Sequence, residues 1–400
     1  MRRKFTDIVE FSGKACSSFD GKKSYISTGC VHDDHICKDE IEAVDYSSKP
    51  SRANLVVKPG DILFAKMQAT KKTLLIDEDL SQNIYSTGFY AVKPKDGPIT
   101  KKCLFYLINS SLFLDEKDKN CSGATQKAIN NQGLGNIELN IPEFSVQESL
   151  TQKLDALSII IEAKQSQIEY LDSLIKARFV EMFGMPGTDP FSYGIKELGK
   201  CCELNPKKAQ DKRLTSNIDV SFIPMPSVSE NGDIDPTDIR SYEEVKKGFT
   251  YFAENDVLFA KITPCMENGK GAVARGLKNG IGFGSTELHV LRPIKDISNP
   301  YWIYVLTSFK SFRKDAEANM TGSAGQRRTP VSFLDNYKVA LPPIYLQNQF
   351  AAFVAQVDKS KFAISQSLLL LTKAFSASSI PHSRQISVLL SSRDSAGQPT

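Results

Sequence analysis

The strongest constraint on the fold is that the sequence repeats itself at half its length. The segment GDILFAK at residues 60–66 recurs as NDVLFAK at residues 255–261. Further matches follow in the same order, and the later ones are all 200 residues apart in a chain of 400. Residues 86–94 match 285–293 at an offset of 199, and the later matches pair Gln126-Lys127 with Gln326-Arg327 and Val146-Gln147 with Leu346-Gln347 at an offset of 200. Solenoid repeats are only about 20–50 residues long, so this pattern indicates two copies of a whole domain.

Each copy begins with short strands, continues with a helix and ends in a much longer helix. Runs rich in β-branched and aromatic residues, bounded by Pro, Gly or Asn, predict strands at residues 57–66, 84–92, 252–261 and 288–291. Segments 102–113 and 300–312 predict helices. The mixture of strands and helices in each copy indicates globular domains that contain both.

A heptad pattern spans about residues 145–183 and returns from about residue 345. Its apolar residues alternate at spacings of four and three, which is typical of a coiled-coil seam. At about 1.5 Å per residue the first helix would be roughly 55–60 Å long, which is longer than a single small domain can cover. We therefore expect the two helices to pair, the alternative being that each packs on its own domain. The predicted seam residues are Leu150, Leu154, Leu157, Ile161, Ile168, Leu171, Val354, Val357, Ile364, Leu368 and Leu371.

The repeat and the heptads together predict an α+β fold with internal pseudo-twofold symmetry. Two globular α/β domains, residues 1–144 and 184–343, are separated by two long helices at 145–183 and 344–378. Residues 379–400 are rich in serine, contain prolines and lack heptads, which predicts a flexible tail.

The net charge of the chain excludes a protein that binds nucleic acid through its overall charge alone. The chain has 50 basic and 46 acidic residues, a net charge of +4. DNA binding would therefore depend on local patches or on a more basic partner. No run of apolar residues is long enough to cross a membrane, and the N-terminus leads into no secretion signal. We expect a cytoplasmic protein whose eight cysteines are reduced thiols, with no membrane partner.

Motifs for catalysis and metal binding are weak. The cluster His32, Asp33, Asp34, His35 and Cys37 has zinc-ligand chemistry, but no second ligand pair follows at a suitable spacing. A polar surface loop is therefore favoured, and we expect no metal. The segment NPYW at 299–302 resembles the NPPY loop of amino methyltransferases but lacks the second proline and a glycine-rich cofactor turn, so a helix start is favoured. We expect no catalytic residue in this chain.

Polar clusters at matched places in the two copies are the best candidates for a binding site. Arg and Lys pair with guanine edges, Asn and Gln pair with adenine edges, and Ser, Thr and Lys hold phosphates. Because the clusters recur with different residues inside them, a repeated DNA-binding face is favoured over ordinary solvated loops. The candidates are Lys66, Gln68, Thr87, Gln126, Lys127 and Asn130 in the first copy, and Lys261, Thr263, Lys270, Thr286, Gln326, Arg327, Arg328 and Thr329 in the second.

The order domain, long helix, domain, long helix resembles the specificity (S) subunit of type I restriction–modification systems. The segments FAKITPC at 259–265 and GSAGQRR at 322–328 are similar to that family's target-recognition-domain signatures. YISTG at 25–29 and the segment 198–208 fit its domain openings. The resemblance extends to about residue 378. The first copy departs more, with Ala128-Ile129 in place of Arg328-Thr329 and Met67-Gln68 in place of Thr263-Pro264.

The resemblance implies a non-catalytic DNA-specificity subunit. Each globular domain would be a target-recognition domain that reads one half of a bipartite double-stranded DNA target through the major groove. The two helices would pair antiparallel as a spacer, two modification subunits that methylate adenine would dock on them, and restriction subunits can join. S-adenosylmethionine, ATP and Mg would belong to those partner subunits. The alternative is a two-domain coiled-coil adaptor without a role in DNA binding.

Overall fold

The computed structural model describes residues 2–32, 35–124, 126–323 and 325–378. The expected tail at 379–400, together with Asp33 and Asp34 of the possible zinc cluster, lies outside the described residues. The chain divides into two units: residues 1–165 with 366–400, and residues 166–365. Each unit therefore contains one globular domain and part of both long helices. No helix in the described ranges is long and apolar enough to span a membrane.

The first unit contains a four-stranded sheet in the order β10-β9-β12-β2 and a five-stranded sheet in the order β3-β8-β11-β4-β7. Its strands are β1 (Arg2–Lys4), β2 (Val9–Phe11), β3 (Lys14–Ala15), β4 (Lys22–Ile26), β5 (Val31–His32), β6 (His35–Ile36), β7 (Glu42–Asp45), β8 (Ala53–Val56), β9 (Ile62–Ala65), β10 (Thr73–Leu75), β11 (Ile84–Ser86), β12 (Phe89–Pro94) and β13 (Glu138–Asn140). Its short α-helices are α1 (Phe5–Ile8), α2 (Lys101–Ile108), α3 (Ser111–Lys119) and α4 (Asn131–Gly135).

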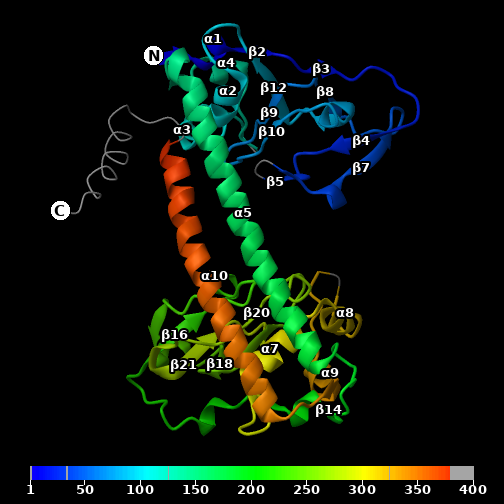
Figure 1. Cartoon of the computed structure of the whole chain (residues 1–400), viewed down its shortest axis with the longest axis vertical. Coiled ribbons are helices and arrows are strands. Elements are labelled where there is room, and N and C mark those ends of the chain that lie inside the picture. Colours follow the sequence, from blue (N-terminus) through cyan, green and yellow to red (C-terminus); the bar gives the residue numbers. More distant parts are fainter. Residues whose placement is uncertain (1, 33–34, 125, 324, 379–400) are drawn as a thin grey trace, which may run out of the picture. The chain divides into compact units, whose positions relative to one another are not determined.

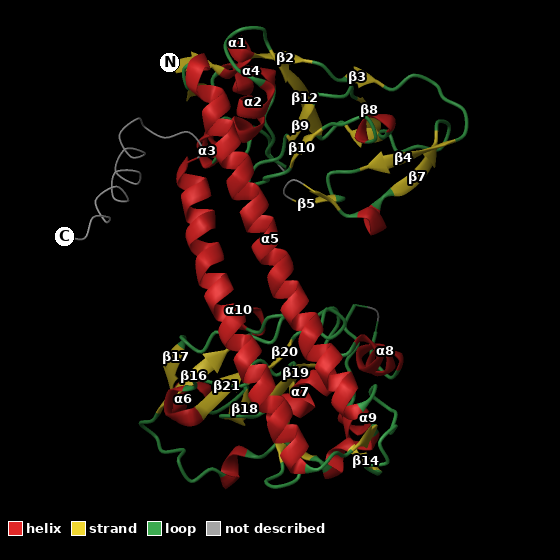
Figure 2. Cartoon of the chain, in the orientation of Figure 1, coloured by secondary structure: helices red, strands yellow, loops and turns green. Residues whose placement is uncertain are grey.

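The second unit repeats this plan with sheets in the orders β15-β22-β19-β20 and β17-β16-β21-β18. Its strands are β14 (Ile195–Glu197), β15 (Cys202–Leu204), β16 (Asp219–Ile223), β17 (Ile239–Ser241), β18 (Thr250–Ala253), β19 (Val257–Ala260), β20 (Gly271–Val273), β21 (Ile281–Gly284), β22 (Leu288–Pro293) and β23 (Lys338–Ala340). Its short α-helices are α6 (Tyr242–Val245), α7 (Pro300–Ser308), α8 (Lys310–Ala318) and α9 (Val331–Asn336) (Figure 2).

The two copies also share strand pairing and core packing. Both contain one parallel pair, β4 with β11 and β16 with β21, among antiparallel neighbours. In each, a phenylalanine of the central strand packs edge-to-face on a buried phenylalanine of a helix: Phe64 on Phe113 at 5.4 Å and Phe259 on Phe312 at 5.9 Å between ring centroids. The predicted α+β class with an internal repeat is confirmed, because the fold as well as the sequence is duplicated.

Several predicted elements are interrupted, and the reason is local in each case. The single strand expected at 84–92 is two strands, β11 and β12, because the chain turns at Thr87-Gly88. The strand expected at 57–66 is reduced to β9 because Gly60, with φ of 91°, forms a turn. The helix expected at 102–113 is α2 and α3, since the Ser110 side chain accepts a hydrogen bond from the Phe113 amide and starts a new helix.

The long helices are α5 (Phe144–Phe183) and α10 (Ile344–Ser378). In the second unit they pack against each other (Figure 1). Phe183 of α5 contacts Phe350 of α10 at 5.5 Å between ring centroids, and Asp172 accepts a hydrogen bond from Lys361 Nζ at 2.6 Å. Residue numbers fall along α5 as they rise along α10, so the pairing in this unit is antiparallel. The eleven predicted seam residues are all buried or half-buried.

A buried glutamine at the start of each long helix ties it to its own domain. Gln147 and Gln347 are both fully buried. Gln347 Oε1 accepts a hydrogen bond from the Asn299 amide at 2.9 Å, and its Nε2 donates to the carbonyls of Ile297 at 3.0 Å and Pro342 at 2.8 Å. Gln147 makes the same three bonds one copy earlier, with the Thr100 amide and the carbonyls of Pro98 and Pro142. This explains why Gln recurs at an exact offset.

Candidate nucleic-acid interface

In the first domain, backbone hydrogen bonds bring three of the predicted polar segments together. The Lys66 amide donates to the Gly88 carbonyl at 2.9 Å, which joins the loop after β9 to the turn that contains Thr87. The Gln68 amide donates to the Lys127 carbonyl at 3.0 Å, and the Ile129 amide donates to the Lys66 carbonyl at 2.9 Å. The loop after β9 therefore lies between the turn at 86–88 and the segment 126–130.

The second domain repeats these bonds atom for atom. The Lys261 amide donates to the Glu287 carbonyl at 2.9 Å, the Thr263 amide to the Arg327 carbonyl at 3.1 Å, and the Thr329 amide to the Lys261 carbonyl at 2.8 Å. The predicted candidates of each copy are thus spatial neighbours within their own domain. In each copy, two other stretches of the sequence are therefore bonded to the loop that follows the central strand.

These bonds correct one correspondence between the copies. The sequence comparison placed Met67-Gln68 opposite Thr263-Pro264. The matched bridges Met67–Ala128 and Ile262–Arg328 instead make Met67 the counterpart of Ile262. Gln68 then corresponds to Thr263, and Pro264 has no equivalent because the second loop is longer.

The candidate side chains of the first domain form a mildly basic, amide-rich face. Gln68, Thr87, Gln126 and Lys127 are exposed. Gln126 Nε2 lies 3.1 Å from the Met67 sulfur. Lys66 is half-buried, and its ammonium lies 4.3 Å from the centre of the Tyr90 ring. Burial lowers the pKa of Lys66, so the aromatic ring and the surrounding loops hold this cation partly away from water.

In the second domain, carboxylates hold the two arginines. Arg328 makes a two-pronged ion pair with Glu287, from Nε at 2.9 Å and from Nη2 at 2.8 Å. Arg328 holds the pKa of the Glu287 carboxyl below its ordinary value. Arg327 Nη2 lies 3.5 Å from Glu317 and 3.8 Å from Glu267. Such carboxylates fix the direction of a guanidinium and also repel phosphates, so they favour precise contacts over general attraction to DNA.

Of the remaining candidates, some are exposed and others support the loops. Gln326 and Thr286 are exposed, and Lys261 is half-buried. Lys270 donates to the Met225 carbonyl at 3.4 Å, and the Thr263 hydroxyl donates to Glu267 at 2.8 Å.

Two candidates have clear structural roles. Asn130 caps α4 by accepting a hydrogen bond from the Gly133 amide. The Thr329 side chain is only 1% exposed, which places it behind the loop rather than on the face.

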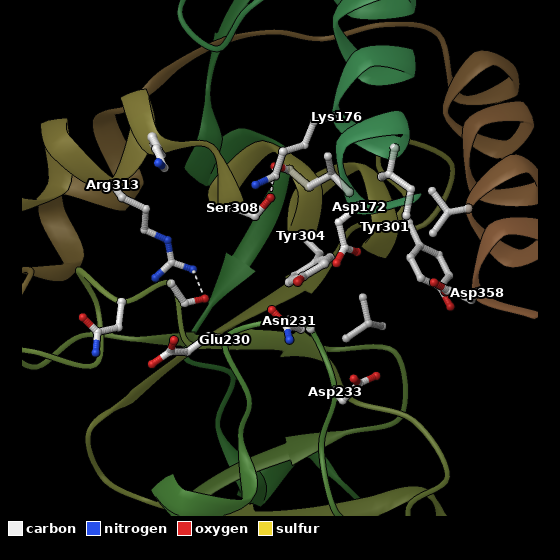
Figure 3. A pocket seen from close by; sticks show the side chains of 18 of the residues that line it. Asp172, Lys176, Glu230, Asn231, Asp233, Tyr301, Tyr304, Ser308, Arg313 and Asp358 are labelled. Carbon is white, nitrogen blue, oxygen red and sulfur yellow. Dashed lines mark hydrogen bonds between the residues drawn. The ribbon is translucent and has the colours of Figure 1, made fainter. Parts of the chain in front are cut away.

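A cavity of about 600 Å³ lies next to this loop in the second unit (Figure 3). Residues of α5, α7, α8 and α10 line it together with the loop at 230–234. The carboxylates of Asp172, Asp233 and Asp358 face it, and burial raises the pKa of Asp358. Lys361 and Arg275 partly balance these charges. This cavity could not be predicted from the sequence, because its walls come from segments far apart in the chain.

The possible zinc cluster is not assembled in the part of the chain that the structure describes. His32 and His35 lie opposite each other on the β5–β6 hairpin, with ring centroids 6.2 Å apart, and His32 Nε2 is 3.5 Å from Glu40. No group of three or more His, Cys, Asp or Glu side chains among the described residues is arranged to hold a metal ion.

Comparison with known proteins relates both halves of the chain to one family. The family model for the type I restriction modification DNA specificity domain matches residues 2–170 and again 192–370. The specificity subunit of the type I restriction enzyme EcoAI from Escherichia coli is 46% identical over 157 residues, which are 38% of this chain and 26% of that protein. The corresponding subunit of EcoEI, also from Escherichia coli, is 42% identical over 149 residues, 37% of this chain and 25% of that protein. The matches thus span about a quarter of these relatives.

A solved structure supports the fold over nearly the whole length. A chain from a study of complex assembly and conformational transition in a type I restriction–modification system covers 95% of this chain and 96% of its own length. The TM-score is 0.53 at 18% sequence identity. The likeness therefore covers both halves of the chain and concerns the fold alone.

Proposed function

Because this chain belongs to the family of type I restriction–modification DNA specificity domains, we propose that it reads a bipartite double-stranded DNA target, with one recognition domain on each half. The observation that carries the proposal is the duplicated loop assembly. Both domains hold the same three segments together with the same backbone bonds but display different side chains. A target whose two halves differ requires different side chains on the same loop scaffold. The reason is that contacts to the bases, rather than to the DNA backbone, specify sequence.

The readers we propose are the exposed or half-buried candidates of each loop assembly. In the first domain, Gln68 and Gln126 offer amides suited to adenine edges, with Lys66 and Lys127 for guanine or phosphate. In the second domain, Arg327 and Arg328 are suited to guanine, and their carboxylate partners hold them in position. Thr329 is left out of this set because its side chain is buried.

The long helices would act as a spacer and as the dock for partner subunits. Several large apolar side chains remain exposed on them outside the seam, among them Ile159, Tyr170, Phe362 and Leu370. Tyr170 and Leu370 occupy equivalent places in the two copies, 200 residues apart. An exposed apolar residue at the same position of both copies suits two copies of one partner, which we take to be the modification subunit.

The chain would be non-catalytic. S-adenosylmethionine, ATP and Mg would be bound by partner subunits, with restriction subunits joining in the same complex. Its near-neutral charge fits a DNA clamp shared with those subunits. The cytoplasm, where the host chromosome lies, would be its place of action.

Footprinting tests this function directly. The chain is purified together with its modification subunits, and protection of random DNA fragments is mapped. We expect two short protected sequence blocks separated by a fixed unread gap. A complex that protects no sequence in preference to others would favour the adaptor function instead.

A further inference from the structure

A buried cation lies behind the loop after β9 in the first domain. Lys117 of α3 is 1% exposed. Its ammonium donates to the carbonyls of Thr70 at 2.7 Å, Met67 at 2.9 Å and Ala65 at 3.5 Å. Asp118, at 3.7 Å, is the nearby carboxylate. The carbonyls of one loop thus replace most of the water that this ammonium lost on burial.

A different buried cation lies behind the equivalent loop of the second domain. Arg313 of α8 is 5% exposed and lies over the Phe259 ring at 4.3 Å. Its Nη1 donates to the Met266 carbonyl at 3.0 Å and its Nη2 to the Gly269 carbonyl at 3.3 Å. Its Nε donates to the carbonyl of Thr307, near the end of α7, at 2.7 Å. Figure 3 shows the Arg313 side chain reaching from its helix into the wall of the cavity.

The two cations are not at equivalent sequence positions. The matched pair Phe113 and Phe312 aligns α3 with α8 at an offset of 199 residues. Lys117 then corresponds to Ala316, and the counterpart of Arg313 is Leu114. Positions three apart share one face of a helix. Each domain therefore places one cation on the same face of the same helix, one turn apart, and an apolar residue at the other position.

We propose that Lys117 and Arg313 are positioning residues that fix the shape of the two DNA-reading loops from behind, without contacting DNA. This inference rests on the proposed function. An apolar side chain would fill either site without the cost of burying a charge. That cost is offset only while the loop carbonyls remain turned inward. Burial lowers the pKa of Arg313 to about 10, which reflects this cost and leaves the charge in place at neutral pH.

We call each buried cation, together with the loop carbonyls that it binds, a loop clamp. The clamp in each domain matches the length of its own loop. The first loop is short, and one ammonium reaches carbonyls from Ala65 to Thr70. The second loop is longer, and the wider guanidinium fork reaches Met266 and Gly269. The longer loop of the second domain is thus held by a cation of a different shape, which lies one turn earlier on the helix. The clamp residue therefore belongs to the specificity of its own half-site, although it lies out of reach of the bases.

The test uses the full chain in complex with its modification subunits. Arg313→Met removes the donors at similar length, and Arg313→Lys retains the charge. Amide hydrogen exchange is followed in residues 261–270 and 66–70, and binding is measured to DNA altered in one half-site at a time. For Arg313→Met we expect at least tenfold faster exchange in residues 261–270 only. We also expect about tenfold weaker discrimination at one half-site, and Arg313→Lys should fall between this variant and the unaltered chain.

Lys117→Met is the corresponding variant of the first domain. It should speed amide exchange only in residues 66–70 and weaken discrimination only at the other half-site. The double variant Arg313→Leu with Ala316→Lys transfers the first arrangement into the second domain and should recover part of the protection lost in Arg313→Met. Unchanged exchange and unchanged discrimination in both methionine variants would refute the clamp. An unaltered complex without any sequence preference would refute the proposed function, and the exchange data would still decide whether the clamp holds the loops.

Discussion

Gln347→Leu should destabilise the second unit strongly, because this fully buried side chain holds three backbone groups at once. The substitution leaves the Asn299 amide and the carbonyls of Ile297 and Pro342 without their partner. An unpaired buried group costs about 1–3 kcal/mol. Ile297 is exposed, so water can reach its neighbourhood, and the lower part of that range applies. The expected loss in the free energy of unfolding is therefore about 3–5 kcal/mol.

Hydrogen exchange measured by mass spectrometry suits this prediction because it reports on each unit separately. Protection should fall in residues 166–365 and remain in residues 1–165. Asn348→Ala is the matched control, since Asn348 is exposed and accepts one hydrogen bond from the Asn299 side chain. Its effect should stay within about 0.5 kcal/mol. If Gln347→Leu lowers the free energy of unfolding by less than about 1 kcal/mol, the buried hydrogen bonds are not what ties α10 to its domain.

Three further predictions concern recognition, spacing and pH. Arg327→Ala should cost about 1–3 kcal/mol of binding or base discrimination in one half-site only, and equal loss in both halves of a footprint would contradict the assignment. Insertion of four residues, about one helical turn, near Gln165 should lengthen the unread gap without changing either half, and an unchanged methylation motif would count against a spacer role. Burial lowers the pKa of His289 below its ordinary value near 6.5, so the folded state resists protonation and stability should fall as the pH drops below about 6.5, by up to about 1.4 kcal/mol per pH unit. In urea unfolding from pH 7.5 to 5, His289→Gln should remove that part of the slope, and identical slopes would refute it.

The features that recur along the chain could be predicted from the sequence. The duplicated fold followed from matches such as those around Lys66 and Lys261, and the seam followed from heptads that need no tertiary information. The recurrence of Gln147 and Gln347 was visible as well, but its meaning was not. Only the structure shows that each glutamine bridges its helix to a loop nearly 50 residues earlier.

The features that differ between the copies could not be predicted. Glu287, which holds Arg328, stands where the first copy has Gly88, and no motif links residues 41 positions apart. Thr329 follows two half-buried arginines in sequence, yet the loop turns its side chain fully inward. The buried cations Lys117 and Arg313 occupy different positions, so aligning the copies hides their common role. In each case the partner is chosen by tertiary packing rather than by local sequence.

The central claim is that this chain gives a methylating complex its DNA sequence specificity. Methylation sequencing of host DNA, with the chain present and with its gene deleted, tests that claim most directly. We predict that one bipartite motif, two short blocks separated by a fixed gap, is methylated when the chain is present and is lost on deletion. Methylation that persists unchanged at every motif after deletion would contradict the account.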